Sequence, residues 1–205
     1  AMQSEYREYI EAWVHEIKTP IAASKLMIEN HQGAPIVGIT EELKKIEDYI
    51  EQVLYYARSS SASRDYIVKE FRLKECVAKV IKRNAKAFIH KKIQLKLSEI
   101  NDVVYSDEKW VEFIVNQIIV NSINYCYKED SVVSIYTSNH VHNLILHIVD
   151  NGVGIDEKDI GRVFEKGFTG ENGRLYRKST GIGLYLCKTL ADKLHLGIII
   201  QSQKG

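Results

Sequence analysis

A histidine near the start of the chain has neighbours suited to phosphoryl chemistry. Glu16 follows His15 directly, and Thr19 lies one helical turn further along, just before Pro20. Glu16 can accept one imidazole proton, which leaves the other ring nitrogen free to attack phosphorus. Thr19 can orient a water molecule at the same place, and Pro20 removes a backbone hydrogen bond beside it. The segment therefore predicts a nucleophilic histidine with an adjacent general base.

A lone histidine is more often structural, but the position of His15 on its helix favours a nucleophilic role. Apolar residues around it step by four, three and four, which indicates a seam against another helix: Tyr6, Ile10, Trp13 and Ile17. His15 lies about 200° around the helix from its neighbours on this seam, so it is expected to point toward solvent. A zinc-protease HExxH motif is excluded, because Thr19 stands where the second histidine would be.

A stripe of amide side chains interrupts an apolar helix expected at residues 107–125. Gln117, Asn121 and Asn124 recur at steps of four and three residues and therefore share one face. A capping or surface stripe is the alternative interpretation, but the same face carries Trp110 and Phe113. Partly buried amides need a partner, and amide oxygens suit Mg²⁺, a hard cation that also keeps water and phosphate ligands. We therefore expect a ligand at this face.

Two glycine-rich segments follow the amide stripe. Asp150 precedes Gly152 and Gly154 at the end of an apolar strand, where the backbone can approach a flat ligand and the carboxylate can accept from an exocyclic amine. Residues 179–184 open a helix, and free amides at a helix N-terminus favour a phosphate. This second segment has neither the P-loop spacing nor the preceding strand of a Rossmann fingerprint. Between the two segments, aromatic and basic residues predict a lid over a triphosphate: Phe164, Phe168, Arg174, Arg177 and Lys178.

The elements that would position these residues fall into two parts. Two seamed helices joined by a loop at residues 30–38 predict an antiparallel hairpin over residues 1–60, whose small core favours a four-helix bundle in a homodimer. The polar segment at residues 59–63 is an expected hinge, and the linker is placed at residues 61–66. Residues 67–205 mix helices with strands, which predicts an α+β fold, an α/β sandwich with helices on one face of a mixed sheet.

Periodicity places the elements of this second part. Helices are expected at residues 73–89, 107–125 and 182–194, the central one capped by Ser106. Alternation predicts strands at residues 93–97, 103–105, 132–137, 144–149 and 198–200. Residues 150–179 are rich in glycine and charge and show little regular pattern.

Composition narrows the classes of function. Apolar residues make up 45% of the 205 positions, which is ordinary for a globular protein with a real core. The formal charge of +1 does not favour nucleic acid as a partner. The three cysteines form no CxxC pair, which fits a reducing cytoplasm and supports neither a disulfide framework nor a metal cluster. No stretch approaches the roughly 18 apolar residues of a membrane span, so we expect a soluble chain.

The run HEIKTP at residues 15–20 resembles the phosphoacceptor box of the HisKA histidine kinases. The amide stripe, the two glycine segments and the lid between them resemble the N, G1, F and G2 boxes of the GHKL ATP-binding fold. Together these likenesses cover nearly the whole chain and imply the cytoplasmic region of a bacterial sensor histidine kinase. By this resemblance His15 receives the γ-phosphoryl group of ATP, Glu16 is the base, and Thr19 assists dephosphorylation of the partner regulator.

The same resemblance implies the parts of an ATP site. Asn121 would be the Mg²⁺ ligand with Gln117 on the same face, and Asp150 would bind the adenine amino group. Many relatives carry lysine in place of Asn124, so basic lid residues would have to replace one phosphate contact. In relatives the chain also continues into one more strand beyond the position of residue 205. The remaining expected nucleotide-binding residues are Asn124, Tyr125, Gly152, Gly154, Ile155, Phe168, Arg174, Arg177, Lys178, Thr180, Gly181, Ile182, Gly183 and Leu184.

The resemblance also implies partners. The segments WVHEIKTPIAASKL and GFTGENGRLYRKSTGIGLYLCK resemble the short intramembrane-sensing kinases of Gram-positive bacteria, which work beside transporters that detect or export antimicrobial peptides. That likeness implies a cell-membrane protein with a homodimeric cytoplasmic region, a response-regulator receiver domain as phosphoryl acceptor, and a transporter complex as partner. Two other functions stay open: a GHKL ATPase that uses ATP as a conformational clamp, and a nucleotide-dependent scaffold without histidine phosphorylation.

Overall fold

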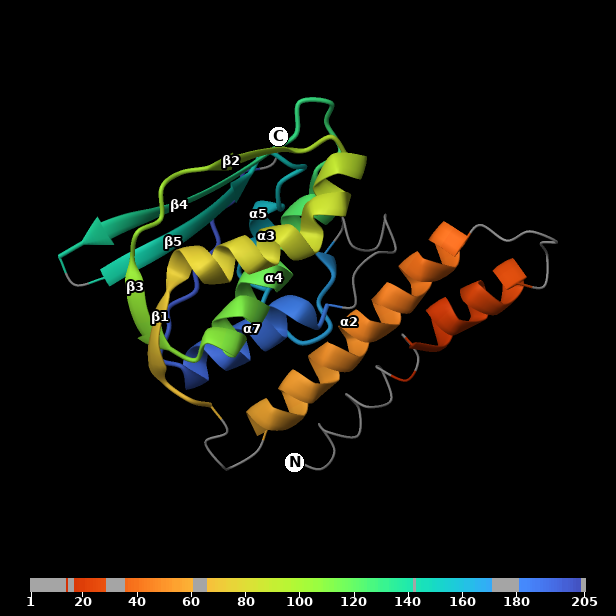
Figure 1. Ribbon diagram of the computed structural model, residues 1–205, viewed down its shortest axis with the longest axis horizontal. Helices are drawn as coiled ribbons and strands as arrows, with labels where there is room; N and C mark the ends of the chain where they lie inside the picture. Colours follow the sequence, from red (N-terminus) through yellow and green to blue (C-terminus); the bar gives the residue numbers. More distant parts are fainter. Residues whose placement is uncertain are drawn as a thin grey trace. The chain divides into compact units, whose positions relative to one another are not determined.

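The computed structural model describes residues 14, 17–28, 36–60, 66–141, 143–170 and 181–203. The chain divides into two compact units, Ala1–Ser63 and Arg64–Gly205. The described residues of the first unit are helical, whereas the second unit combines helices with strands (Figure 1). In the described part of the chain, no helix is both long and apolar enough to cross a membrane.

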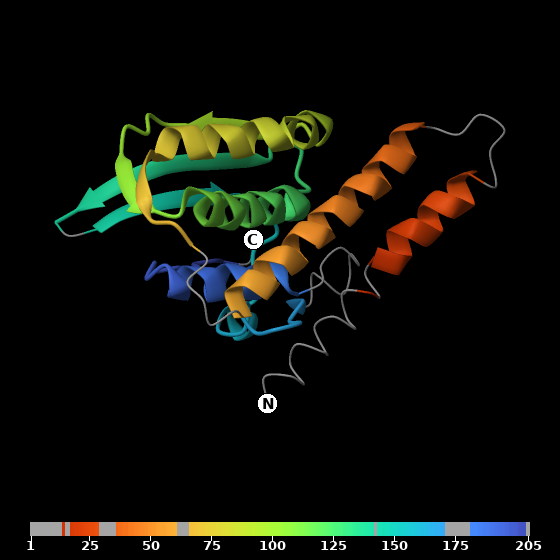
Figure 2. The same ribbon diagram turned by 60° about the horizontal axis from the view of Figure 1, so that its bottom comes forward.

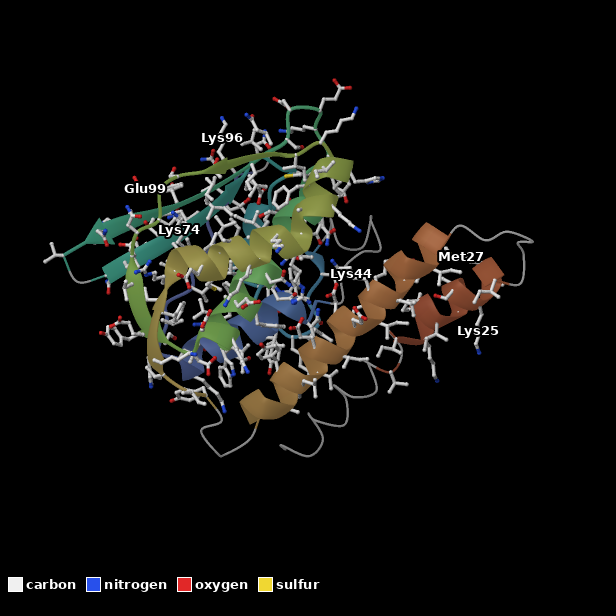
Figure 3. The ribbon with its side chains drawn as sticks, in the orientation of Figure 1. Lys25, Met27, Lys44, Lys74, Lys96 and Glu99 are labelled. Atoms are coloured by element: carbon white, nitrogen blue, oxygen red, sulfur yellow. The ribbon has the colours of Figure 1, made fainter. Side chains whose placement is uncertain are left out.

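The first unit contains a helix over residues 17–28 and the helix α2 (Ile36–Ser60). The two helices lie close together at Gly38 and Met27, whose side chain is labelled in Figure 3. A Cβ added to Gly38 would lie only 3.2 Å from the sulfur of Met27. Helix α2 begins at Ile36, so the loop expected through residue 38 was predicted too long. It also continues through Ser60, because serine is only weakly unfavourable in a helix and no proline or glycine ends it earlier.

A three-stranded mixed sheet forms the frame of the second unit. Its strands are β2 (Gln94–Leu97), β4 (Val132–His140) and β5 (Asn143–Asp150), in the order β2-β4-β5. β2 runs parallel to β4, whereas β4 and β5 form a long antiparallel hairpin (Figure 1). The hairpin register pairs Asp150 with Val133, which places the aspartate at the end of the sheet where β4 begins. The mixed sheet confirms the predicted fold class.

A second, two-stranded sheet pairs β1 (Lys69–Arg72) with β3 (Val103–Ser106). The sequence did not predict β1, because only Phe71 of its four residues is buried and the other three are charged. The strand expected at residues 198–200 was wrong. None of the described strands pairs with that segment, and Ile199 is 84% exposed. An apolar run forms a strand only where a neighbouring backbone accepts its hydrogen bonds.

Among its described residues, the second unit packs three long helices: α3 (Leu73–His90), α4 (Glu108–Tyr125) and α7 (Gly183–Lys193). Helices α3 and α4 share one hydrophobic core with the sheet, and α7 packs along α4 (Figure 2). The core residues at the centre are completely or almost completely buried: Cys76, Val77, Val80, Ile119, Val133 and Ile135. Helix α4 therefore lies between the sheet and α7 and contacts both.

The N-terminus of α4 is capped by Asp107, not by Ser106 as predicted. Oδ1 of Asp107 accepts from the backbone N–H of Trp110 at 3.0 Å, and Oδ2 accepts from the N–H of Ile67 at 2.7 Å. A serine hydroxyl could cap the helix, but the two oxygens of a carboxylate also anchor the chain that enters the unit. The cap thus fixes both the start of α4 and the first residues after the linker.

Candidate functional site

Both glycine-rich segments contact helix α4. Near its C-terminus, the hydroxyl of Ser122 donates to Asp150, and the carbonyl of Tyr125 accepts from the backbone N–H of Val153 at 3.2 Å. Nearer its middle, Gln117 lies against Gly183, the first residue of α7. The contacts at residues 117 and 122 are about 7.5 Å apart along the helix axis, which one elongated small molecule can span. The structure therefore brings the amide stripe and both glycine segments together on one helix.

Asp150, the last residue of β5, is held through both of its carboxylate oxygens. Oδ1 accepts from the backbone N–H of Gly152 at 3.0 Å, and Oδ2 accepts from the hydroxyl of Ser122 at 2.8 Å. Each carboxylate oxygen offers about two acceptor positions, so the exposed side chain keeps acceptor capacity on both oxygens. The carboxylate is thus oriented by the protein while it stays available to a donor from a ligand.

Gly152 is required by the close approach of the loop to α4. A Cβ at this position would lie 2.7 Å from the carbonyl oxygen of Tyr125 and 2.8 Å from Oδ1 of Asp150. Both distances are shorter than a side chain tolerates, so a larger residue would push the loop away from the helix and displace the carboxylate. Gly154, two residues on, has a φ of +71°, a conformation that glycine adopts without strain.

The amide stripe is half-buried, as its pattern predicted. Gln117 is buried, whereas Asn121 and Asn124 are partly exposed. Among the residues that the structure describes, the side chains of Asn121 and Asn124 form no hydrogen bond with the protein, which leaves their amide oxygens available to a cation or a ligand. The neighbouring Asn116 differs, because its oxygen accepts from the side chain of Asn84 at 2.8 Å inside the core.

The second glycine segment packs on the start of the predicted lid. Gly181 has a φ of +67°, and a Cβ there would lie 2.4 Å from the carbonyl carbon of Gly167. The backbone N–H of Gly167 donates to the carbonyl of Gly181 at 3.0 Å. Two segments 14 residues apart in the sequence are thus joined backbone to backbone, at a point where only glycine fits.

Phe168, next to this junction, is held by residues that the sequence did not single out. The guanidinium carbon of Arg162 lies 4.5 Å from the centre of the Phe168 ring, and the Nε of Arg162 lies 3.0 Å from a carboxylate oxygen of Glu165. Arg162 follows the short helix α5 (Glu157–Ile160), which the irregular pattern of residues 150–179 concealed. The i, i+3 spacing of Arg162 and Glu165 was the available signal, but exposed pairs of this kind are common.

The N-terminus of α7 lies beside the amide stripe. Ile182 is the N-cap residue, and its apolar side chain makes no capping bond to the first-turn amides. A Cβ at Gly183 would lie 2.8 Å from Oε1 of Gln117, which shows how closely the amide stripe approaches this helix end. Backbone amides at a helix N-terminus, beside an amide side chain, suit an anion.

Several predicted residues lie outside the described part of the chain. These are His15 and Glu16 in the first unit and, in the second, Arg174, Arg177, Lys178 and Thr180. Thr19 lies in the helix of residues 17–28 with its side chain exposed. Tyr125, Ile155 and Leu184 are partly exposed near the site, and the N–H of Ile155 donates to the hydroxyl of Ser202 at 2.9 Å. The roles of all these residues stay predictions.

Residues 106–205 match the family of histidine kinase-, DNA gyrase B- and HSP90-like ATPases. The matched range begins at the end of β3 and includes α4, the Asp150 loop and α7, so it contains every described contact among the amide stripe and the two glycine segments. This part of the chain is therefore an ATP-binding domain of that family.

Comparison over the whole chain narrows the class. The sensor histidine kinase YxdK of Bacillus subtilis is 33% identical over 198 residues, which are 96% of this chain and 61% of YxdK. The sensor protein BceS of the same organism is 33% identical over 206 residues, which are 100% of this chain and 61% of BceS. Over nearly its whole length the chain is similar to sensor histidine kinases, as predicted, and it spans about three fifths of the length of these two relatives.

A solved structure shows the same fold. Histidine kinase ThkA, in complex with the response regulator protein TrrA, superposes with a TM-score of 0.64 at 18% identity, over 95% of this chain and 59% of that one. At this identity the likeness establishes the arrangement of helices and strands and leaves the residues of the site to be argued from this chain.

Proposed function

We propose that this chain is the catalytic region of a sensor histidine kinase that uses Mg-ATP to phosphorylate His15. The observation that carries the proposal is the convergence on α4 of the anchored Asp150, the side-chain amide of Asn121, which has no hydrogen-bond partner among the described residues, and the N-terminus of α7. The same chain carries the HEIKTP segment of a phosphoacceptor helix. An ATP site and a nucleophilic histidine are the two components that such a kinase needs.

The nucleotide is placed by its two ends. Asp150 accepts a hydrogen bond from the adenine amino group, because both of its oxygens keep acceptor capacity in an orientation fixed by the protein. The phosphates occupy the N-terminus of α7 at residues 181–184, where backbone amides favour negative charge. The remaining proposed contacts come from Asn124, Tyr125, Gly154, Ile155, Phe168, Thr180 and the basic residues Arg174, Arg177 and Lys178.

The chemistry of the amide stripe fits a magnesium ion. Asn121 would hold the metal through its side-chain oxygen, with Gln117 one turn before it on the same helix face. When bound with ATP, Mg²⁺ neutralises charge on the phosphate oxygens. Asn124 carries no charge where many relatives have lysine, so the basic lid residues take over that phosphate contact.

Phosphoryl transfer then requires only a nucleophile and a base. A ring nitrogen of His15 forms a bond to the γ-phosphorus as the bond between that phosphorus and the oxygen of ADP breaks. Glu16 holds the proton on the other ring nitrogen and so leaves the attacking nitrogen unprotonated. The phosphoryl group passes next to an aspartate of a response-regulator receiver domain, and Thr19 orients the water that later removes it.

The expected partners follow from the family. A homodimer would complete a four-helix bundle from two copies of the helical hairpin. A response regulator is supported by the fold shared with ThkA, which was solved with one. The longer relatives support a whole protein with additional segments, for which we propose a cell-membrane location and a transporter complex as partner.

Incubation with γ-labelled ATP tests the proposal. The purified chain is expected to acquire label that is lost in acid and kept in base, as a phosphohistidine is. His15→Gln should abolish the label, whereas His90→Gln, at an exposed position of α3, should keep it. Label that persists in His15→Gln would remove the phosphoacceptor assignment. Steady ATP hydrolysis without any phosphoprotein would favour the conformational clamp instead.

A further inference from the structure

Ser122 touches the proposed adenine-binding carboxylate without being one of the predicted site residues. Its hydroxyl donates to Oδ2 of Asp150 at 2.8 Å, across 28 positions of sequence. The serine is 5% exposed and lies on α4 between the core residues Ile119 and Ile123. A hydroxyl in this apolar surrounding needs a partner, and the partner it has is the carboxylate at the end of β5.

Two hydrogen bonds from different parts of the protein fix the orientation of the Asp150 carboxylate. The bond to Oδ1 is donated by the backbone N–H of Gly152, in the same loop as the aspartate. The bond from Ser122 to Oδ2 is supplied by a side chain and comes from a different element of the fold. One bond alone lets the carboxylate swing about its terminal torsion, which is broad for aspartate, whereas two bonds on different oxygens fix it.

We propose that Ser122 is a positioning residue for adenine recognition. By holding Oδ2, it aims the free acceptor positions of Asp150 at the exocyclic amine and so sets the preference for adenine over purines without a 6-amino group. The inference rests on the proposed function, in which Asp150 binds that amine. Ser122 makes no contact of its own with the base in this scheme and acts through the carboxylate.

A purely structural serine makes a different prediction. If Ser122 only satisfied a buried polar position, its replacement would lower stability and weaken all nucleotides by the same factor. A positioning residue changes the ratio between a nucleotide with the 6-amino group and one without it. That ratio is therefore the quantity to measure, because a general loss of folding cancels from it.

The experiment compares ATP with purine riboside triphosphate, which lacks only the 6-amino group, by calorimetric titration of the 205-residue chain in the presence of Mg²⁺. Ser122→Ala should bind ATP about tenfold more weakly and the analogue within about twofold of the wild type, as expected for the loss of a hydrogen bond to a charged group. Ser122→Thr keeps a hydroxyl and should retain most of the ratio. Ser131→Ala is the matched control, because Ser131 is 2% exposed and its hydroxyl donates elsewhere, to the carbonyl of Lys128.

The outcomes separate the inference from the proposed function. A wild-type preference for ATP that survives in full in Ser122→Ala overturns the positioning role and leaves the Asp150–adenine contact standing. A wild type that binds both nucleotides equally overturns that contact, and the inference with it. A preference lost in Ser122→Ala, kept in Ser131→Ala and restored in Ser122→Thr supports both. Thermal unfolding of each variant confirms that folded protein was titrated.

Discussion

Replacing Gly181 by alanine tests whether the lid and the second glycine segment act as one unit. The added Cβ would lie 2.4 Å from the carbonyl carbon of Gly167 and 2.7 Å from both its oxygen and the nitrogen of Phe168. All three are backbone atoms, so no side chain can rotate out of the way. The backbones must separate by about 1 Å to reach an ordinary van der Waals distance.

The cost follows from three contributions. A φ of +67° costs alanine about 1–2 kcal/mol more than glycine. The hydrogen bond from Gly167 to Gly181 contributes about 0.5–1.5 kcal/mol and is lost as the backbones separate. The clash adds to both, and we expect about 2–4 kcal/mol against the native junction. The protein can avoid part of this cost by releasing the loop, so the effect should be larger on nucleotide binding than on global stability.

Nucleotide titration and urea unfolding measure the two effects. Gly181→Ala is expected to weaken ATP binding by about 30-fold or more, because 1.4 kcal/mol corresponds to a factor of ten. Gly161→Ala is the matched control, since Gly161 has a φ of −65° and nothing within 4 Å of an added Cβ; it should change stability by less than about 1 kcal/mol and leave binding unaltered. If Gly181→Ala bound ATP as tightly as the wild type, the junction would have no role in the site.

Three further predictions concern anchors and buried groups. Asp107→Ala removes both the cap of α4 and the bond to the segment at Ile67, and should lower the free energy of unfolding by about 1–2 kcal/mol in urea; an unchanged midpoint would contradict the double role. Arg162→Met keeps much of the side-chain length but loses the cation over the Phe168 ring, and should weaken ATP binding severalfold while Lys158→Met, at an exposed position, does not. Burial raises the pKa of the three cysteine thiols, that of Cys76 to about 12, so they should react with a thiol reagent at pH 8 only as the protein unfolds; fast labelling of folded protein would show the burial to be wrong. Because the pKa of Cys76 lies above the ordinary value of 9.0, this thiol contributes stability that is complete below pH 9 and declines as the pH rises toward 12.

Local patterns were sufficient for the long helices and for the boxes of the site. The apolar spacing of α3, α4 and α7 placed each helix within a few residues, because a helix buries one face and its period repeats along the sequence. The alternation in β4 and β5 was equally informative, since each strand is long enough to show it. The short strand β1 was missed, and a strand at residues 198–200 was wrongly expected. A segment of three or four residues is too short for its own pattern to show whether a neighbouring strand will pair with it.

The HEIKTP run, the amide stripe and the two glycine segments are all visible in the sequence, and their resemblance to the HisKA and GHKL boxes implied the kinase family. What the tertiary structure decided is how those segments meet. It buried Asn116 in the core and left the side chain of Asn121 without a hydrogen-bond partner in the described part of the chain. It also joined Gly181 to Gly167 and brought Ser122 to Asp150. The reason is physical: side-chain type and period are local properties, whereas a hydrogen bond across 28 residues depends on the register of β5 and its packing against α4.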